Sequence, residues 1–274
     1  MKIVITNKRK TIITIGTGIV LVLLVIFGIR SCGHKTLDLD EITDSGRLRV
    51  FTDSSSYGFV VRGDSVYGFQ YEIVKQFANS LGVELQVTQQ NNINEGIEGL
   101  LNGEYDIVAN FIPNTTELGE KVLYTSPLFS SRLMLVQQKK ADSLGVIDIK
   151  SQLDLANDTI YTAYQSPDNM RLRHLANEIA DTIYLIEMKH ASMEQMVKYV
   201  SEGKIKNTIC PEHFSNKFKT GFDNIDISVP LGFTQNYSWI VHPGSKHLLD
   251  KLNDFLNDFI GSEEYWILYR KYYK

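Results

Sequence analysis

The segment 68–110 constrains the fold of this chain more than any other stretch, because it alternates between helical and strand patterns. Apolar residues recur at helical spacing over 73–81, and Gly82 follows where a helix would end. An order of helix, strand, helix, strand is typical of an α/β lobe, in which ligands bind beyond the carboxyl ends of the strands. The expected elements are a helix ending at Gly82, a strand at 84–88, a helix at 97–101 and a buried strand at 106–109.

A second alternating unit follows a polar break at 139–143. Ser166-Pro167 and the capping-box pattern from Ser192 to Gln195 indicate two helix starts within it. The chain then returns with one more strand and two helices, so two lobes are expected. Outside the first segment, the predicted strands are 48–52, 131–138, 159–164, 182–188, 207–210 and 238–242, and the predicted helices are 167–179, 192–200, 248–260 and 263–272.

The composition is that of a folded protein without a nucleic-acid partner. Its 274 residues are 43% hydrophobic and 22% charged, and the net charge is -4, so no broad basic surface is expected. The six histidines show no metal-ligand spacing, and two cysteines are too few for a disulfide framework. Cys210 is expected to be a small buried group. No metal and no cofactor are therefore predicted.

The stretch 11–29 contains no charged residue and would span roughly 28 Å as a helix, close to the thickness of a bilayer core. Basic residues are concentrated in the preceding segment 1–10, which favours a cytoplasmic amino terminus and an extracytoplasmic remainder. A single-pass, uncleaved anchor followed by a linker at 30–44 is the favoured interpretation. The alternative is a lipoprotein acylated at Cys32, since residues 29–32 loosely match a lipoprotein box.

Landmarks spread over the chain carry a family resemblance. They include Tyr57-Gly58-Phe59, Gly68-Phe69 with Glu72, and Ser126-Pro127. In this order and spacing the chain resembles a type II periplasmic solute-binding protein of the amino-acid-binding family. The resemblance implies a two-lobed α/β fold with a hinge, here preceded by the transmembrane helix. It places lobe 1 at 45–138 plus 231–274, and lobe 2 at 139–230.

The segment 68–87 is particularly similar to the amino-terminal module of the membrane-bound lytic murein transglycosylase F family, whose members add a catalytic lysozyme-like domain. This chain ends at Lys274, where the binding module would finish, so we expect no glycosidase activity. Enzymes such as dehydratases occur on the same fold, which leaves catalysis as a minor alternative. No triad, metal motif or phosphate loop supports it.

The resemblance also implies where a ligand would bind, and two of its contact positions differ here. Thr115 matches a threonine that holds a ligand carboxylate, whereas Leu118 stands where the family has the carboxylate-binding arginine. The aspartate that receives the ligand amine falls at Pro211, and the adjacent Glu212 could substitute for it. Without a cation to pair its carboxylate, an ordinary free α-amino acid is a poor ligand.

Five further positions complete the predicted site. Tyr57 matches an aromatic residue that stacks on the ligand, although packing between lobes is an equal interpretation. Asn110 and Phe111 follow a core strand, where clefts form. Gln165 and Ser166 lie at a helix start, whose free N–H groups accept anions, although helix capping alone would also explain Ser166.

The sequence thus predicts a membrane-tethered, extracytoplasmic protein that closes on a small polar ligand, such as an amino-acid-like compound, a peptide or a cell-wall fragment. A role in transport predicts an inner-membrane permease as partner, whereas a role in sensing predicts a signalling or cell-wall partner. The alternative is a degenerate module that binds no ligand and recruits a protein. Leu118 and Pro211 motivate that alternative.

Overall fold

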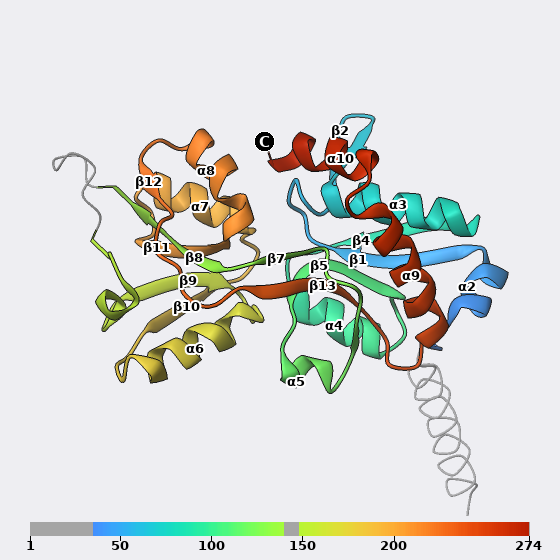
Figure 1. Cartoon of the computed structure of the whole chain (residues 1–274), viewed down its shortest axis with the longest axis horizontal. Helices are drawn as coiled ribbons and strands as arrows, with labels where there is room; N and C mark the ends of the chain where they lie inside the picture. Colours follow the sequence, from blue (N-terminus) through green and yellow to red (C-terminus); the bar gives the residue numbers. More distant parts are fainter. Residues whose placement is uncertain (1–34, 140–147, 274) are drawn as a thin grey trace, which may run out of the picture. The chain divides into compact units, whose positions relative to one another are not determined.

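The computed structural model describes residues 35–139 and 148–273 (Figure 1). The chain from Thr36 onward forms one compact unit. Within the described ranges, no helix has the length and apolar character needed to cross a membrane. The predicted anchor at 11–29 and Cys32 lie outside the described residues, so they stay predictions.

The first lobe is built on a six-stranded mixed sheet with the order β4-β1-β5-β13-β6, in which β7 also pairs with β13. β1 runs parallel to β4 and β5, whereas β13 runs antiparallel to β5, β6 and β7. The carboxyl ends of β1 and β5 therefore meet at one edge of the sheet. The strands are β1 Arg47–Thr52, β4 Glu84–Gln89, β5 Ile107–Pro113, β6 Leu123–Tyr124, β7 Phe129–Ser131 and β13 Gln235–Val241.

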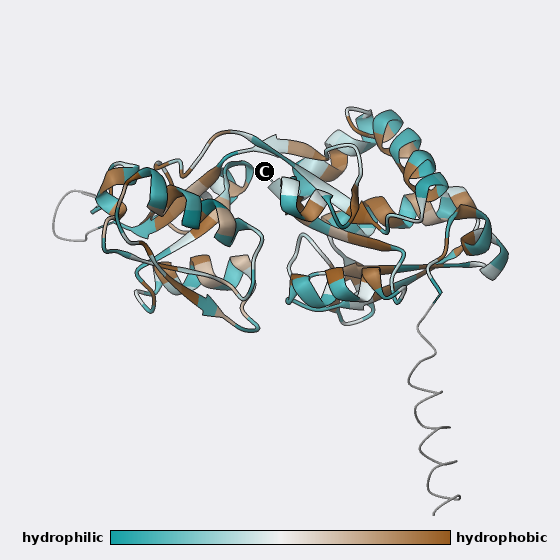
Figure 2. Cartoon of the chain, turned by 90° about the horizontal axis from the view of Figure 1, so that it is seen from below, coloured by the Kyte–Doolittle hydropathy of each residue, from teal (hydrophilic) through white to brown (hydrophobic). Residues whose placement is uncertain are grey.

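Helices cover both faces of this sheet. Val50 of β1 packs in the cluster that includes Phe77 of α3 and Leu252 of α9, whereas the next residue, Phe51, packs on the other face with Leu100 of α4. This alternation follows from the period-2 geometry of a strand. Figure 2 shows hydrophobic residues along the strands and hydrophilic residues on the outer helical turns. The helices are α2 Leu39–Ser45, α3 Phe69–Leu81, α4 Ile93–Leu101, α5 Thr116–Gly119, α9 Lys246–Phe259 and α10 Glu263–Tyr273.

The second lobe contains a three-stranded sheet of order β11-β8-β12 and a parallel pair formed by β9 and β10. Asn207 and Thr208 of β11 donate side-chain hydrogen bonds to carbonyls of β9, which joins the two groups of strands. α6 packs Leu172 on one side, and α7 packs Val197 on the other. The elements are β8 Leu133–Gln138, β9 Thr159–Ala163, α6 Asp168–Glu178, β10 Tyr184–Met188, α7 Met193–Ser201, β11 Asn207–Pro211, α8 Ser215–Gly221 and β12 Ile225–Asp226, with 3-10 turns at Gln152–Leu155 and Glu212–Phe214.

The strand predicted at 131–138 is divided in the structure. β7 pairs with β13 of the first lobe, whereas β8 pairs with β11 and β12 of the second lobe. The chain therefore crosses between the lobes near Arg132, and the boundary drawn at 138 placed β8 in the wrong sheet. A continuous β pattern does not reveal which strand it pairs with, because pairing is a non-local property.

The alternation predicted for 68–110 agrees with the structure. Gly82 ends α3 with a positive φ of 70° and donates its N–H to Ala78 O, which is the left-handed cap that a glycine favours. Ser192 caps α7 in a capping box with Gln195. The short hairpin of β2 Val60–Arg62 and β3 Ser65–Tyr67 was not predicted from the sequence.

Candidate functional site

A cavity of about 150 Å³ lies where strand ends of the two lobes face each other. The first lobe contributes the residues that follow β1 and the carboxyl half of β5. The second lobe contributes the starts of α6 and α7 and the end of β11. The volume of the cavity is below the roughly 300 to 1,000 Å³ of pockets for drug-sized ligands, so the cavity suits a small solute. Four of the predicted residues line it: Tyr57, Asn110, Phe111 and Ser166.

Thr115 and Gln165 lie in a neighbouring pocket of about 330 Å³, which shares Ser166 with the cavity. Thr115 accepts a hydrogen bond from Leu118 N at 3.3 Å and thereby caps α5. The Gln165 side chain accepts a hydrogen bond from Asn94 Nδ2 of the first lobe at 3.2 Å. In this structure both residues hold protein groups at the edge of the cleft, so their role as ligand contacts stays a prediction.

Glu212 lines neither pocket. It forms a two-pronged ion pair with Arg132, at 3.0 Å from Nε and 2.5 Å from Nη2. These hydrogen bonds from Arg132 hold the pKa of Glu212 below its usual value. The sequence analysis names Glu212 as a possible substitute for the aspartate missing at Pro211. In this structure it pairs with Arg132 beside the crossing between the lobes, so its role as a ligand contact stays a prediction. Arg132 was not singled out in the sequence because this pairing joins residues 80 positions apart.

The ring of Tyr57 is largely covered by the protein itself. Tyr273 stacks on it with ring centroids 5.2 Å apart, Phe214 of the second lobe meets it at 4.3 Å, and the Lys217 Nζ lies 4.3 Å from its centroid. Tyr57 is 1% exposed, and burial raises the pKa of its hydroxyl well above the usual value. These contacts favour the packing interpretation of the ring, while its buried hydroxyl has no hydrogen-bond partner.

Two aspartates that the sequence analysis did not single out also line the cavity. Asp53 directly follows β1, and its carboxylate accepts hydrogen bonds from Ser55 N at 2.7 Å and Asn110 Nδ2 at 3.1 Å. Asp168 is the first residue of α6 and accepts a hydrogen bond from Ser166 Oγ at 3.3 Å. Their positions after a buried strand and at a helix start are the signals that could have found them.

Both carboxylates are held in a poorly solvated place. Desolvation raises the pKa of Asp168 to about 6. Desolvation also raises the pKa of Asp53, and the nearby Glu194 carboxylate raises it further. Among the described residues, no ion pair reaches either carboxylate, and no lysine, arginine or histidine lines the cavity. The site therefore holds two carboxyl groups that no cationic side chain in the described part of the chain neutralises.

Gly58 allows the backbone to pass close to Asp53 in the first lobe. A Cβ at this position would lie 2.2 Å from Asp53 O and 2.6 Å from Asp53 Oδ1, too close for any other residue. The Phe59 N–H donates to Asp53 O at 3.0 Å. The Tyr57-Gly58-Phe59 landmark thus folds tightly around Asp53, which fixes the direction of its carboxylate.

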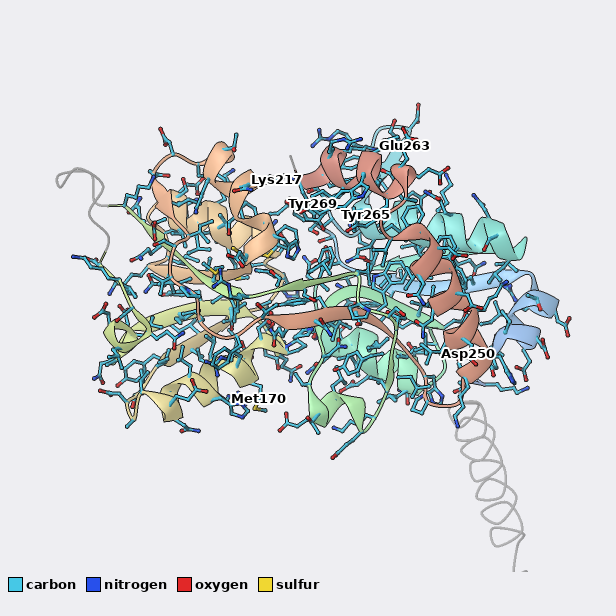
Figure 3. All side chains as sticks on the ribbon, viewed as in Figure 1. Met170, Lys217, Asp250, Glu263, Tyr265 and Tyr269 are labelled. Carbon is cyan, nitrogen blue, oxygen red and sulfur yellow. The ribbon has the colours of Figure 1, made fainter. Side chains whose placement is uncertain are left out.

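Contacts across the rim join the lobes on the side of α7 and α8. Ser56 donates from its hydroxyl and its N–H to the Glu194 carboxylate, at 2.5 and 3.2 Å. Lys217 lies 3.9 Å from the same carboxylate and 3.4 Å from Ser56 Oγ. Figure 3 shows Lys217 on α8, on the side of the second lobe toward Tyr269. Within the residues that the structure describes, no cluster of side chains could hold a metal ion.

Curated relatives are similar to this chain in sequence over about half of their own length. The membrane-bound lytic murein transglycosylase F of Desulfosudis oleivorans is 22% identical over 233 residues, covering 85% of this chain and 50% of that protein. The protein of the same name from Stutzerimonas stutzeri is 27% identical over 250 residues, covering 90% of this chain and 49% of that protein. The chain thus spans about half the length of these relatives.

Solved structures share the fold across almost their whole length. A mutant of ArgBP from T. maritima superposes with a TM-score of 0.72 at 20% identity, covering 86% of this chain and 99% of that one. An amino acid ABC transporter substrate-binding protein from Streptococcus pneumoniae, bound to L-arginine, also gives 0.72 at 18% identity, covering 85% and 97%. Residues 48–274 match the family described as bacterial extracellular solute-binding proteins, family 3. The chain belongs to this family and has its type II solute-binding fold.

Proposed function

We propose that this protein closes its two lobes on a small polar ligand held in the 150 Å³ cavity. The observation that carries the proposal is a set of buried polar atoms that belong to residues lining this cavity and have no hydrogen-bond partner among the described residues. They are Tyr57 OH, Asn110 Oδ1 and Asp168 Oδ1. An unpartnered buried polar atom costs free energy, and a ligand that supplies the missing partners recovers it.

Closure would follow from contacts with both lobes. A ligand that touches Asn110 of the first lobe and Asp168 of the second binds the closed form better than the open form. The chain crosses between the lobes near Arg132, beside the Arg132–Glu212 pair, which is where we expect the hinge. The rim contacts of Ser56 and Glu194 would form in the same movement.

The range of ligands extends from amino-acid-like compounds to short peptides and cell-wall fragments. The small cavity favours the smaller end of this range. An ordinary α-amino acid remains a poor candidate, because Leu118 and Pro211 replace the two charged groups that the family uses for it. We expect binding without turnover.

Localisation in the bacterial cell membrane is part of the proposal. Residues 11–29 would anchor the chain once, with the binding domain in the periplasm, and a lipid on Cys32 is the alternative anchor. A tether limits the reach of the domain, which suits delivery to a nearby permease or sensing beside a cell-wall or signalling partner. Mass measurement of the mature protein from membranes tests the anchor, since an intact Met1 end excludes acylation at Cys32.

A second candidate function is a regulatory module that binds no ligand and recruits a protein. The observation in its favour is that the chain already joins its own lobes, through the Ser56–Glu194 hydrogen bonds and through Phe214 against Tyr57. A cleft closed in this way needs no solute to stay shut.

A thermal-shift screen against amino acids, amines, short peptides and muropeptides separates the two. A ligand that binds the native state raises the melting temperature, and the stabilisation grows with the logarithm of the ratio of ligand concentration to Kd. At 100 times Kd the stabilisation is about 2.7 kcal/mol, which is easily detected. Flat melting curves with every compound would reject solute binding and favour the interaction module.

A further inference from the structure

Among the described residues, those that line the cavity offer a ligand two carboxyl groups and further acceptors, and no fixed positive charge. Asp53 from the first lobe and Asp168 from the second lobe both line it. Lys217, which contacts the lining residue Tyr57, lies over the ring of that tyrosine and beside Glu194, and it does not line the cavity itself. An ion of opposite sign is the usual partner of a desolvated carboxylate, and the protein does not supply one here.

A second observation, which concerns oxygen atoms without a donor and includes one on a neutral side chain, points the same way. Asn110 lines the cavity, is 9% exposed and donates its amide N–H to Asp53, and its buried Oδ1 accepts no hydrogen bond from the described residues. Asp168 Oδ1 is likewise buried and unpartnered. A ligand rich in N–H donors would satisfy both oxygens, whereas a ligand rich in acceptors would leave them unpaired.

We infer that the ligand is a small organic cation, an amine or a guanidinium without a carboxylate, held between Asp53 and Asp168 with Asn110 Oδ1 as a further acceptor. This inference rests on the proposed function. Because the two carboxylates belong to different lobes, the cation bridges them and draws the lobes together. The ligand's charge thereby becomes the cause of closure, in addition to its shape.

A zwitterionic amino acid does not fit this arrangement. Its carboxylate would need a cation or a set of free N–H groups, and at the start of α6 it would meet the Asp168 carboxylate. Like charges in a poorly solvated cavity repel strongly. Removal of the carboxylate from arginine leaves agmatine, which keeps the guanidinium and the amine and is therefore the matched probe.

Calorimetric titration of the full chain in detergent at pH 7.5 tests the inference with agmatine, arginine, glutamine and glutamate as probes. We expect agmatine to bind at least tenfold more tightly than the other three. Asp53→Asn and Asp168→Asn should each weaken agmatine binding at least tenfold, because each removes one charge partner. Asp250→Asn on α9 is the matched control and should leave the affinity unchanged, since Asp250 lies outside the cavity lining (Figure 3).

The possible failures differ in what they reject. The cation inference is overturned if arginine, glutamine or glutamate binds more tightly than agmatine. It is also overturned if both aspartate variants retain the affinity for agmatine. Either result leaves solute binding intact. If no probe binds and the melting curves stay flat across the wider solute screen, both the inference and the proposed function are overturned. Melting curves of the two variants confirm that each is folded before its affinity is compared.

Discussion

Two aspartates at opposite ends of the first sheet have opposite surroundings. Asp106, just before β5, has a fully buried side chain that forms an ion pair with Arg49 of β1 at 2.5 Å and also accepts the Arg49 N–H at 2.8 Å. Asp53, just after β1, accepts hydrogen bonds from two neutral groups, Ser55 N and Asn110 Nδ2, and forms no ion pair with the residues that the structure describes. The comparison separates a carboxylate that stabilises the fold from one that is left available for a ligand.

The largest expected effect comes from the paired aspartate. Asp106→Asn leaves the Arg49 guanidinium without its charge partner, so we expect the free energy of unfolding to fall by about 3 to 5 kcal/mol. Arg49 is 22% exposed, which places the effect toward the lower end. Urea unfolding of the variant measures it, with Asp250→Asn as control. A loss below about 1 kcal/mol would show that the two aspartates do not differ as described.

The unpaired carboxylates should respond with the opposite sign. The pKa of Asp168 rises from 3.8 to about 6 on folding, so its charged form is disfavoured in the folded state and stability is lost as the pH rises through this window. Asp168→Asn removes that cost, which is on the order of 3 kcal/mol. The lost negative charge in the first turn of α6 offsets part of it, so we expect a gain of roughly 2 kcal/mol at pH 7.5.

Unfolding midpoints at pH 4 and pH 7.5 check this prediction. The gain should vanish at pH 4, where the carboxyl is protonated in the folded state. The measured pH dependence also includes titratable neighbours of the two aspartates. These are Tyr237 near Asp168, and Glu194 and Tyr273 near Asp53. Equal destabilisation at both pH values would mean that Asp168 is a structural residue.

His213 is a buried base without a charge partner among the described residues, and its effect on the pH dependence of stability can be compared with that of Asp168. Neither nitrogen of His213 has a hydrogen-bond partner in the described part of the chain, and its ring centroid lies 3.8 Å from that of Phe129. Burial lowers the pKa of His213 to about 3. Stability is therefore complete above pH 6.5 and is lost as the pH falls from 6.5 toward 3, at about 1.4 kcal/mol per pH unit. His213→Phe should recover about 1 to 2 kcal/mol at pH 5 and almost nothing at pH 7.5. Identical pH profiles for the variant and the wild type would contradict this.

The smallest expected effect concerns the rim. Glu194→Ala removes the acceptor of both Ser56 hydrogen bonds, so we expect the closed form to lose about 1 kcal/mol and ligand affinity to fall severalfold. Glu202→Ala, which loses only ion pairs with Lys198 and Lys204, is the matched control at the end of the same helix. A larger fall in affinity for the control than for Glu194→Ala would exclude a latch at this rim.

The sequence is informative where structure is local. The helical spacing over 73–81 with Gly82 at its end, and the capping box at Ser192, depend on neighbours in the chain, and both agree with the structure. The division of 131–138 at Arg132 and the pairing of Arg132 with Glu212 depend on distant partners, which periodicity does not encode.

The site was predictable only in part for the same reason. Asn110 and Phe111 were expected to follow a strand ending at 109, whereas β5 continues to Pro113, so the two residues line the cavity from the carboxyl half of the strand. Family positions alone suggested Glu212, which the fold uses in an ion pair instead. Asp53 and Asp168 are 115 positions apart, and their shared lack of a cation becomes visible only when the surrounding side chains are in place.

Closure on a cation is tested most directly by energy transfer between dyes on Asn79→Cys of α3 and Lys219→Cys of α8, in a Cys32→Ser background. Cys210 is 1% exposed and should not label. We predict that agmatine raises the transfer efficiency in this protein and leaves it unchanged when Asp53→Asn and Asp168→Asn are added. Closure driven by a bound cation would be contradicted if no solute changes the transfer efficiency. It would also be contradicted if agmatine raises the efficiency equally in the variant that carries Asp53→Asn and Asp168→Asn.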